Sequence, residues 1–285
     1  MKRVISYLLR AMIIAVALVI LGWLLGLVLP AEQAAEGATG VMGRLGLPLL
    51  SAFLLAAPLA FPISRSRLNG RALFGVVFLA VLGLTTVLTQ VESAVFLDIA
   101  PRELLIGIVE STVTAAVLSW LAVALYARSG IARTSVQRAP NPPTTASWVR
   151  RWIGVSFAYL VLYIAAGLMI LPIIEAWYET QGSLGANPAV VFPLQIVRGA
   201  MFVAILVPLL RSMTVARWQA AVAMAVMIPL VHGVATLILP NPFMPDYVRH
   251  AHMIEIGWSN FVLGLLIGYL FWNPRASADE LIQSP

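Results

Sequence analysis

Eight apolar stretches, each about as long as a bilayer is thick, constrain this chain more than any other feature of its sequence. They lie near residues 4–29, 45–62, 72–97, 102–127, 152–174, 191–210, 218–239 and 248–272. A helix needs about 20 apolar residues to cross the ~30 Å hydrocarbon core of a membrane. We therefore expect an all-α integral membrane protein, a bundle of about eight transmembrane helices in contact with the lipid bilayer.

The composition supports this fold class and excludes several others. Of the 285 residues 61% are hydrophobic and 11% are charged, whereas a typical soluble domain carries roughly 25% charged residues. The chain has no cysteine, which excludes disulfides, thiolate nucleophiles and Cys-ligated metal centres. The first apolar run, residues 11–29, is longer than the core of a signal peptide, so we interpret it as a retained span.

The basic residues alternate between the two ends of the spans. The larger group is Lys2, Arg3, Arg65, Arg67, Arg71, Arg128, Arg133, Arg138, Arg150, Arg151, Arg211, Arg217 and Arg275, and the smaller is Arg44, Arg102 and Arg249. By the positive-inside rule both termini are cytoplasmic, in a multi-pass protein of the inner (plasma) membrane. The net charge of +6 is then a topology signal, and we expect no nucleic-acid partner.

A polar stretch divides the chain into two similar parts. Residues 128–151 are rich in Pro, Ser and Thr, which predicts a cytoplasmic linker between a first four-helix half, 1–127, and a second, 152–285. Both halves carry the same pattern between their second and third spans: Pro62, Arg65, Ser66 and Arg71 in one, Pro208, Arg211, Ser212 and Arg217 in the other. Either the halves are parallel repeats related by an axis along the membrane normal, or each turn is simply a basic cytoplasmic turn.

The last span carries the most unusual chemistry. Prolines before Asp246 forbid a regular helix, so the helix is expected to begin near Asp246, whose side chain can cap it. At about 100° per residue, His252, Glu255 and Ser259 share one face. Farther along, Gly264 and Gly268 form a G-x-x-x-G pattern, which we interpret as packing against another span of the same chain.

Polar residues from five spans lie at a similar depth, in the outer third of each span. They are Glu92, Glu103, Glu110, Arg198, His232, Arg249, His252 and Glu255. An ionised side chain facing lipid costs a few kcal/mol on insertion scales, so these groups are expected to point inward and to meet in one polar layer.

Three functions fit such a layer. The first is an outward-facing pocket that binds or transports a small ion, solute or lipid headgroup. Its candidate residues are Glu92, Glu110, Gln195, Arg198, His232, Asn241, Arg249, His252, Glu255 and Asn260. The inner halves of the spans carry few polar residues, which favours one-sided binding or catalysis over full transport.

The second function is a metal-assisted intramembrane hydrolase or lipid-modifying enzyme. Its candidate catalytic residues are His252, Glu255 and Glu110, and its candidate ligands for a divalent metal are His252, Glu255 and His232. The third is a non-catalytic membrane subunit, in which the ion pairs only hold the bundle together. The sequence alone leaves all three open.

Several motifs carry a resemblance. They are Leu239-Pro240-Asn241-Pro242, Met244-Pro245, Val248-Arg249, His252, Glu255, Ser259-Asn260-Phe261 and Gly264 in the last span, Gln90, Glu92 and Phe96 in the third, and Gln195 with Arg198-Gly199 in the sixth. In these residues the chain resembles a group of bacterial polytopic inner-membrane proteins with no assigned activity. The resemblance implies a bacterial inner-membrane protein of similar topology.

Overall fold

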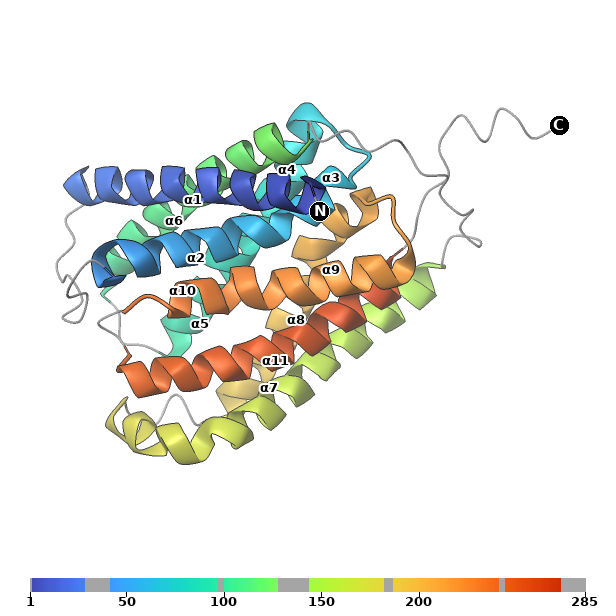
Figure 1. Ribbon diagram of the computed structural model, residues 1–285. Coiled ribbons are helices and arrows are strands. Elements are labelled where there is room, and N and C mark those ends of the chain that lie inside the picture. Colours follow the sequence, from blue (N-terminus) through green and yellow to red (C-terminus); the bar gives the residue numbers. More distant parts are fainter. Residues whose placement is uncertain are drawn as a thin grey trace.

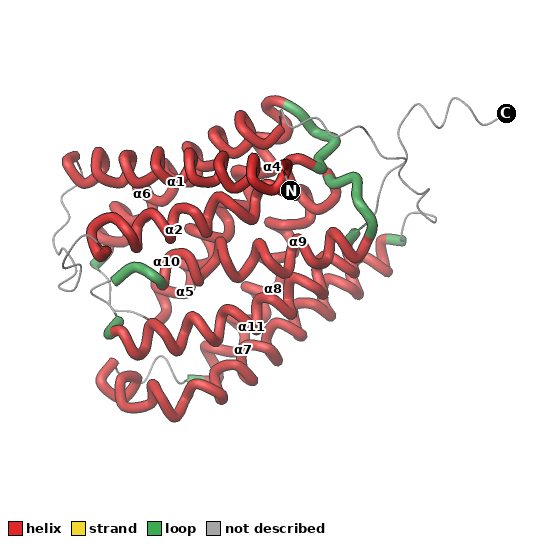
Figure 2. Tube along the Cα trace, viewed as in Figure 1, coloured by secondary structure: helices red, strands yellow, loops and turns green. Residues whose placement is uncertain are grey.

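The computed structural model describes residues 2–28, 42–96, 100–127, 144–181, 187–240 and 244–272. In these ranges the protein is a layered bundle of long helices packed side by side (Figure 1), and the described loops between helices, such as residues 65–69 and 213–216, are short (Figure 2). Eight helical spans are long and apolar enough to cross a membrane. The prediction of an all-α, multi-pass membrane protein is thus confirmed.

Five spans are uninterrupted helices and three contain turns of other helix types. The uninterrupted helices are α1 (Lys2–Val28), α6 (Pro101–Tyr126), α7 (Thr145–Gln181), α8 (Pro188–Ser212) and α11 (Asp246–Phe271). The second span comprises η1 (Met42–Gly46), α2 (Leu47–Ala56), η2 (Ala57–Leu59) and α3 (Ala60–Ser64). The third comprises α4 (Gly70–Leu82), η3 (Gly83–Val87) and α5 (Leu88–Phe96), and the seventh α9 (Arg217–Pro229), η6 (Leu230–Val234) and α10 (Ala235–Leu237).

Helix α7 begins earlier than its apolar stretch. It starts at Thr145, inside the predicted linker 128–151, of which residues 128–143 lie outside the described ranges. The early turns are held by the aromatic ring of Trp148, which lies 5.0 Å from the ring of Phe271. The Arg211 guanidinium stacks over the same indole at 4.0 Å. Aromatic and cation–π contacts thus extend the helix beyond its apolar core.

The glycine pattern of α11 packs inside the bundle, as predicted. A Cβ at Gly264 would lie 2.5 Å from Cα of Ala225, and one at Gly268 would lie 2.4 Å from Cα of Ala221. Because Gly264 and Gly268 have no side chain and lie against alanines of α9, the two helices approach closely. Their contact is the most extensive in the bundle.

Helix α11 begins at Asp246, as predicted, but Asp246 does not cap it. The N-cap is Pro245, which makes no side-chain hydrogen bond. The Asp246 carboxylate instead accepts a hydrogen bond from Nη2 of Arg249 at 2.6 Å. The expected capping role is therefore wrong, because a basic residue one turn later takes the carboxylate.

The two matching basic turns of the sequence lie against each other. The N–H of Arg67 donates to the Ser212 carbonyl and the N–H of Thr214 donates to the Arg65 carbonyl, both at 2.8 Å. The hydroxyls of Ser66 and Ser212 are hydrogen-bonded at 2.9 Å. This turn pair joins the two halves at the end of the bundle where α1 begins and α11 ends (Figure 1).

Candidate functional site

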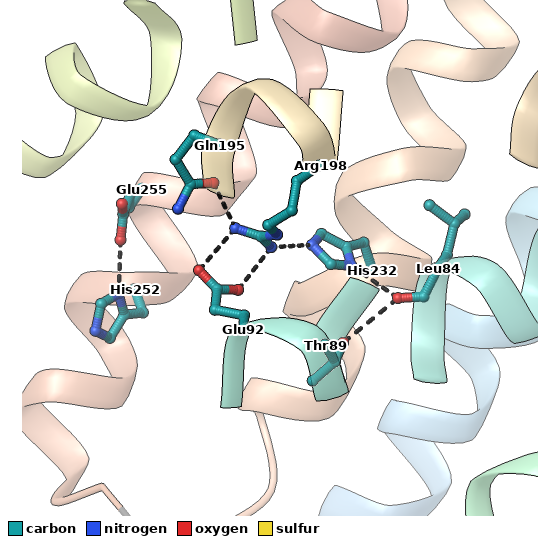
Figure 3. A network of polar contacts seen from close by, with 8 residues as sticks. All are labelled: Leu84, Thr89, Glu92, Gln195, Arg198, His232, His252 and Glu255. Carbon is teal, nitrogen blue, oxygen red and sulfur yellow. Dashed lines mark hydrogen bonds and ion pairs between the residues drawn. The ribbon is translucent and has the colours of Figure 1, made fainter. Parts of the chain in front are cut away.

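A partly buried ion pair between α5 and α8 forms the centre of the polar site (Figure 3). Nη1 and Nη2 of Arg198 donate to Oε1 and Oε2 of Glu92 at 2.8 and 2.6 Å. Arg198 is 1% exposed, whereas the side chain of Glu92 is 31% exposed. The pair is bidentate, the strongest geometry for a guanidinium and a carboxylate.

Other groups around Arg198 add to its contacts with Glu92. Gln195, one turn earlier on α8, accepts a hydrogen bond from Nη1 at 2.8 Å. The ring of Tyr159 lies 5.6 Å from the guanidinium carbon, within cation–π range. The guanidinium is therefore held from α5, α7 and α8, which explains how a cation can be buried at this depth.

His232 links the ion pair to the third span. Its Nδ1 lies 2.7 Å from the carbonyl oxygen of Leu84, and its Nε2 lies 3.4 Å from Nη2 of Arg198. A carbonyl oxygen only accepts, so Nδ1 carries the proton; a guanidinium only donates, so Nε2 is the acceptor. His232 is consequently a neutral imidazole with both nitrogens in use.

Two π-helical turns bring His232 and Leu84 together. His232 lies in η6 and Leu84 in η3, and these turns contact each other. Such turns shift the backbone hydrogen-bond pattern and occur frequently at functional sites. The Leu84 carbonyl here accepts a second side-chain hydrogen bond, from Oγ1 of Thr89 at 3.5 Å. The altered backbone thus supplies an acceptor inside the bundle.

A second pair lies on the first turns of α11. Nδ1 of His252 lies 2.6 Å from Oε2 of Glu255, and both side chains are largely buried. The ring of Tyr178 meets the His252 ring edge to face, at 6.4 Å between centroids. Within the described ranges, Nε2 of His252 has no hydrogen-bond partner, so this nitrogen remains free for another group.

These groups surround a pocket of about 140 Å³ near the C-terminal ends of α5 and α7 and the N-terminal end of α11. We call it the polar pocket. Glu92, Arg198, His232, His252 and Glu255 line it. Its aromatic wall is formed by Tyr159, Tyr163, Trp177 and Tyr178. The expected meeting of polar side chains from several spans is therefore observed for these five residues.

The remaining expected residues are distributed differently. Asn260 lines the polar pocket, and Gln195 contacts it only through Arg198. Asn241 lies outside the described ranges. Glu103 is exposed on the first turn of α6.

Arg249 has a structural role in place of the expected one in the layer. Its Nη1 donates to the carbonyls of Leu237 and Ile238, both at 2.8 Å, and its Nη2 donates to Asp246. It therefore satisfies the carbonyls at the end of α10, which have no partner within their own helix. The expected place of Arg249 in the polar layer is corrected, because the end of α10 lies within reach of its guanidinium.

Glu110 is also separate from the polar pocket. It lines another pocket, formed mainly by α1, α2 and α6. Its place along α6 was used to predict a common depth with the other residues, but position along a helix does not fix the direction in which a side chain points. The expectation that Glu110 joins His252 and Glu255 is corrected accordingly.

The described residues do not favour a metal centre. In the resolved ranges no group of three or more His, Asp or Glu side chains is arranged to hold a metal ion. His232, one candidate ligand, uses Nδ1 for Leu84 and Nε2 for Arg198. His252 and Glu255 are close together but lack a third such ligand.

Several lining groups were not identified as site residues from sequence. Tyr159 and Tyr163 are four residues apart on α7, which places them on one helix face and could have indicated a common role. Trp177 has the pattern of an interfacial anchor, and Tyr178 gave no separate signal. The Leu84 carbonyl is a backbone group, so no pattern of side chains in the sequence predicts its role.

Comparisons with protein-family models, with curated proteins and with solved structures found no match.

Proposed function

We propose that the polar pocket binds a small cationic solute that enters from the outer side of the membrane. The observation that carries this is the charge balance of the pocket walls. Arg198 neutralises Glu92, whereas the ionic partner of Glu255 in the described chain is a histidine, His252. When that imidazole is neutral, the pocket has one uncompensated negative charge.

The aromatic wall supports the same ligand class. Tyr159, Tyr163, Trp177 and Tyr178 line the pocket together with the carboxylates. Aromatic faces attract ammonium groups, and the attraction increases when water is excluded. A volume of about 140 Å³ suits a compact solute of a few non-hydrogen atoms. The fixed Glu92–Arg198 pair supports binding by keeping one wall rigid before a ligand arrives.

The side of entry follows from the distribution of charge. Of the described basic residues, Lys2, Arg65, Arg67, Arg71, Arg150, Arg151, Arg211 and Arg217 belong to the end of the bundle with the turn pair. The polar pocket belongs to the other end. By the positive-inside rule the turn pair and both termini are cytoplasmic, and the pocket faces outward.

Cysteine labelling tests this topology, because the natural chain has no cysteine. Thr145→Cys and Glu179→Cys place single thiols on exposed residues at the two ends of α7. In intact cells a membrane-impermeant maleimide should label the second variant and not the first. The reverse pattern would place the pocket on the cytoplasmic side.

Thermal unfolding tests the ligand class. Ethanolamine, ethylene glycol and glycolate are similar in size and differ in charge, so they form a matched series at constant ionic strength. Ethanolamine should raise the Tm of the wild type, since a ligand at ten times its Kd stabilises by about 1.4 kcal/mol. Glu255→Gln should abolish the shift, and Glu110→Gln, outside the pocket, should keep it. Equal shifts with ethylene glycol or glycolate would contradict cation binding.

The His252–Glu255 pair favours a second candidate, a hydrolase or lipid-modifying enzyme. A carboxylate that holds Nδ1 of a histidine leaves Nε2 available as a general base. Purified protein should then hydrolyse p-nitrophenyl esters of fatty acids, with turnover lost in His252→Ala and reduced in Glu255→Gln. Absence of turnover in the wild type would leave the binding function as the proposal.

An internal repeat is supported by contacts that occur once in each half. Nη1 of Arg10 donates to the Leu125 carbonyl at 2.8 Å, and Nη1 of Arg151 donates to the Leu270 carbonyl at 2.7 Å. The first bond joins α1 to the end of α6, and the second joins α7 to the end of α11. An aromatic pair accompanies each: Tyr7 with Tyr126, and Trp148 with Phe271.

The third and fourth spans of each half support the same relation. Helices α4 and α9 have 13 residues each and lead into π-helical turns of five residues, η3 and η6. Helices α6 and α11 have 26 residues each. Buried residues of α6 have buried counterparts at the same places in α11: Ala115 with Asn260, Leu118 with Leu263, Ser119 with Gly264, Ala122 with Ile267 and Tyr126 with Phe271. We infer two parallel four-helix repeats.

A further inference from the structure

We propose that the chain carries a second binding site, around Glu110, for an amine with an apolar body. This site is the repeat counterpart of the polar pocket. The proposal uses the inferred repeat but does not depend on a ligand in the polar pocket.

The second pocket has a volume of about 430 Å³ and lies between α1, α2 and α6, with α10 at one side. Apolar or small residues form most of its wall, among them Leu18, Gly22, Ala52, Val81 and Leu118. Trp23 of α1 also lines it and is 58% exposed. The pocket therefore adjoins a surface that faces the bilayer in a membrane-spanning bundle.

The two pockets use equivalent positions of the two halves. On α6 and α11, Glu110 corresponds to Glu255 and Thr114 to Ser259, and all four residues line a pocket. Thr85 and His232 are the third residues of the turns η3 and η6, and each lines the pocket of its half. The correspondence thus extends from the helices to the pocket walls.

The polar partners of the first pocket are replaced in the second. Gly107 stands at the place of His252, Ala115 at that of Asn260, and Ala52 at that of Arg198. The matching hydrogen bonds of Arg10 and Arg151 align α1 with α7. In this alignment Leu18 corresponds to Tyr159 and Gly22 to Tyr163, the two tyrosines that narrow the polar pocket. Smaller side chains explain the larger volume. The carboxylate is the ionisable group that both pockets retain.

Glu110 is left without a compensating charge. Within the described ranges its carboxylate has no ion pair or hydrogen bond, and no other lining residue of the pocket is ionisable. Two of the lining hydroxyls are engaged elsewhere: Ser111 donates to the Gly107 carbonyl at 2.6 Å and Thr85 to the Val81 carbonyl at 2.9 Å. Glu110 lies roughly 13 Å along α6 from its first residue. Intramembrane carboxylates at such depth mark functional sites.

The chemistry of the walls selects the ligand. A carboxylate with no basic residue beside it attracts a cation and repels phosphate or another carboxylate. The large apolar wall stabilises a hydrocarbon body by removing it from water. An alkylammonium that partitions into the bilayer satisfies both requirements, and it reaches the pocket from the side of α1.

Carbodiimide protection tests the site on the full-length purified protein. Dicyclohexylcarbodiimide adds to carboxyl groups in apolar surroundings, and peptide mass spectrometry reports the adduct at each glutamate. Dodecylamine should reduce the adduct at Glu110 several-fold and leave the adduct at Glu255 unchanged, while dodecanol, of equal chain length and no charge, should protect neither. Dodecylamine should also raise the Tm of wild type and Glu255→Gln, but not that of Glu110→Gln.

Each other outcome overturns the proposal. Equal protection by dodecanol would indicate a merely apolar pocket, and protection of Glu255 would assign the amine to the polar pocket. No adduct at Glu110 would mean that the carboxyl is not accessible from the membrane. A Tm shift that persists in Glu110→Gln would locate binding elsewhere, independently of the ethanolamine experiment on the polar pocket.

Discussion

The polar pocket and the second pocket differ in how far the protein itself supplies partners for their carboxylates. Around Glu255 the walls supply His252, the Glu92–Arg198 pair and tyrosine rings. Around Glu110 the walls hold glycine, alanine and leucine at the places that correspond in the inferred repeat. One helical framework thus forms two pockets whose walls differ in chemistry. A dense polar wall restricts a ligand in size and hydrogen bonding, whereas a bare carboxylate in an apolar wall selects mainly for charge.

The largest expected difference between the pockets concerns the ion pair. Glu92→Ala leaves the buried guanidinium of Arg198 without its carboxylate, and breaking a buried pair in this way costs about 3–5 kcal/mol. Leu239 lines the second pocket and corresponds to Glu92 in the repeat that we infer, and Leu239→Ala should cost about 1 kcal/mol because only apolar contact is lost. Thermal unfolding followed by circular dichroism measures both. Similar losses for the two variants would mean that the ion pair does not stabilise the bundle.

A smaller difference is expected between the two π-helical turns. His232→Leu removes the donor to the Leu84 carbonyl and the acceptor for Arg198, so we expect a loss of about 2 kcal/mol. In the equivalent turn the hydroxyl of Thr85 bonds the backbone of its own helix, and Thr85→Val should change stability by less than about 0.5 kcal/mol. Thermal unfolding followed by circular dichroism measures both variants. If His232→Leu were as stable as the wild type, the imidazole would not link the ion pair to the third span.

One substitution should reduce the difference between Glu255, which has a histidine partner, and Glu110, which has none in the described ranges. Gly107→His places a histidine one turn before Glu110, as His252 stands one turn before Glu255. A Cβ at this position fits, because its nearest neighbour, Nε2 of Gln90, would lie at 3.5 Å, an ordinary van der Waals distance. The imidazole should bond Glu110 and lower its carbodiimide adduct a few-fold. Gly107→Ala serves as the control that adds volume without a donor. Equal reactivity of both variants would show that the missing partner is not what leaves Glu110 reactive.

The smallest effect is expected at the hydroxyl that both pockets keep. The Ser259 hydroxyl donates to the Glu255 carbonyl of its own helix at 2.6 Å, so it is already satisfied. Ser259→Ala should therefore change unfolding by no more than about 0.5 kcal/mol and leave the ethanolamine-induced Tm shift within twofold. Loss of that shift would make Ser259 a direct ligand contact and enlarge the set of residues that distinguishes the two pockets.

The sequence predicted what depends on length, composition and local spacing. The eight spans, the start of α11 at Asp246 and the packing of Gly264 and Gly268 follow from such local rules. It also placed Arg198, His232, His252 and Glu255 at one depth, and these residues do meet.

The errors concern direction and backbone. Glu110 was expected beside His252 and Glu255 but lines a pocket with residues of α1 and α2, because the rotation of a helix is set by its neighbours. Arg249 was expected in the polar layer and instead binds carbonyls at the end of α10, since those groups become available only when α10 ends beside it. The Leu84 carbonyl joins the site through a π-helical turn, which no residue pattern specified.

The paired turns of Ser66 and Ser212 have a mechanical consequence. Their backbone and hydroxyl hydrogen bonds fasten the halves together at one end of the bundle, while both pockets belong to the opposite end. The Glu92–Arg198 ion pair and the hydrogen bond between His232 and the Leu84 carbonyl join the same two parts of the chain beside the polar pocket. The two parts are thus held together near both ends of the bundle, so a displacement of one against the other at the polar pocket has to break an ion pair there, even while the paired turns stay closed.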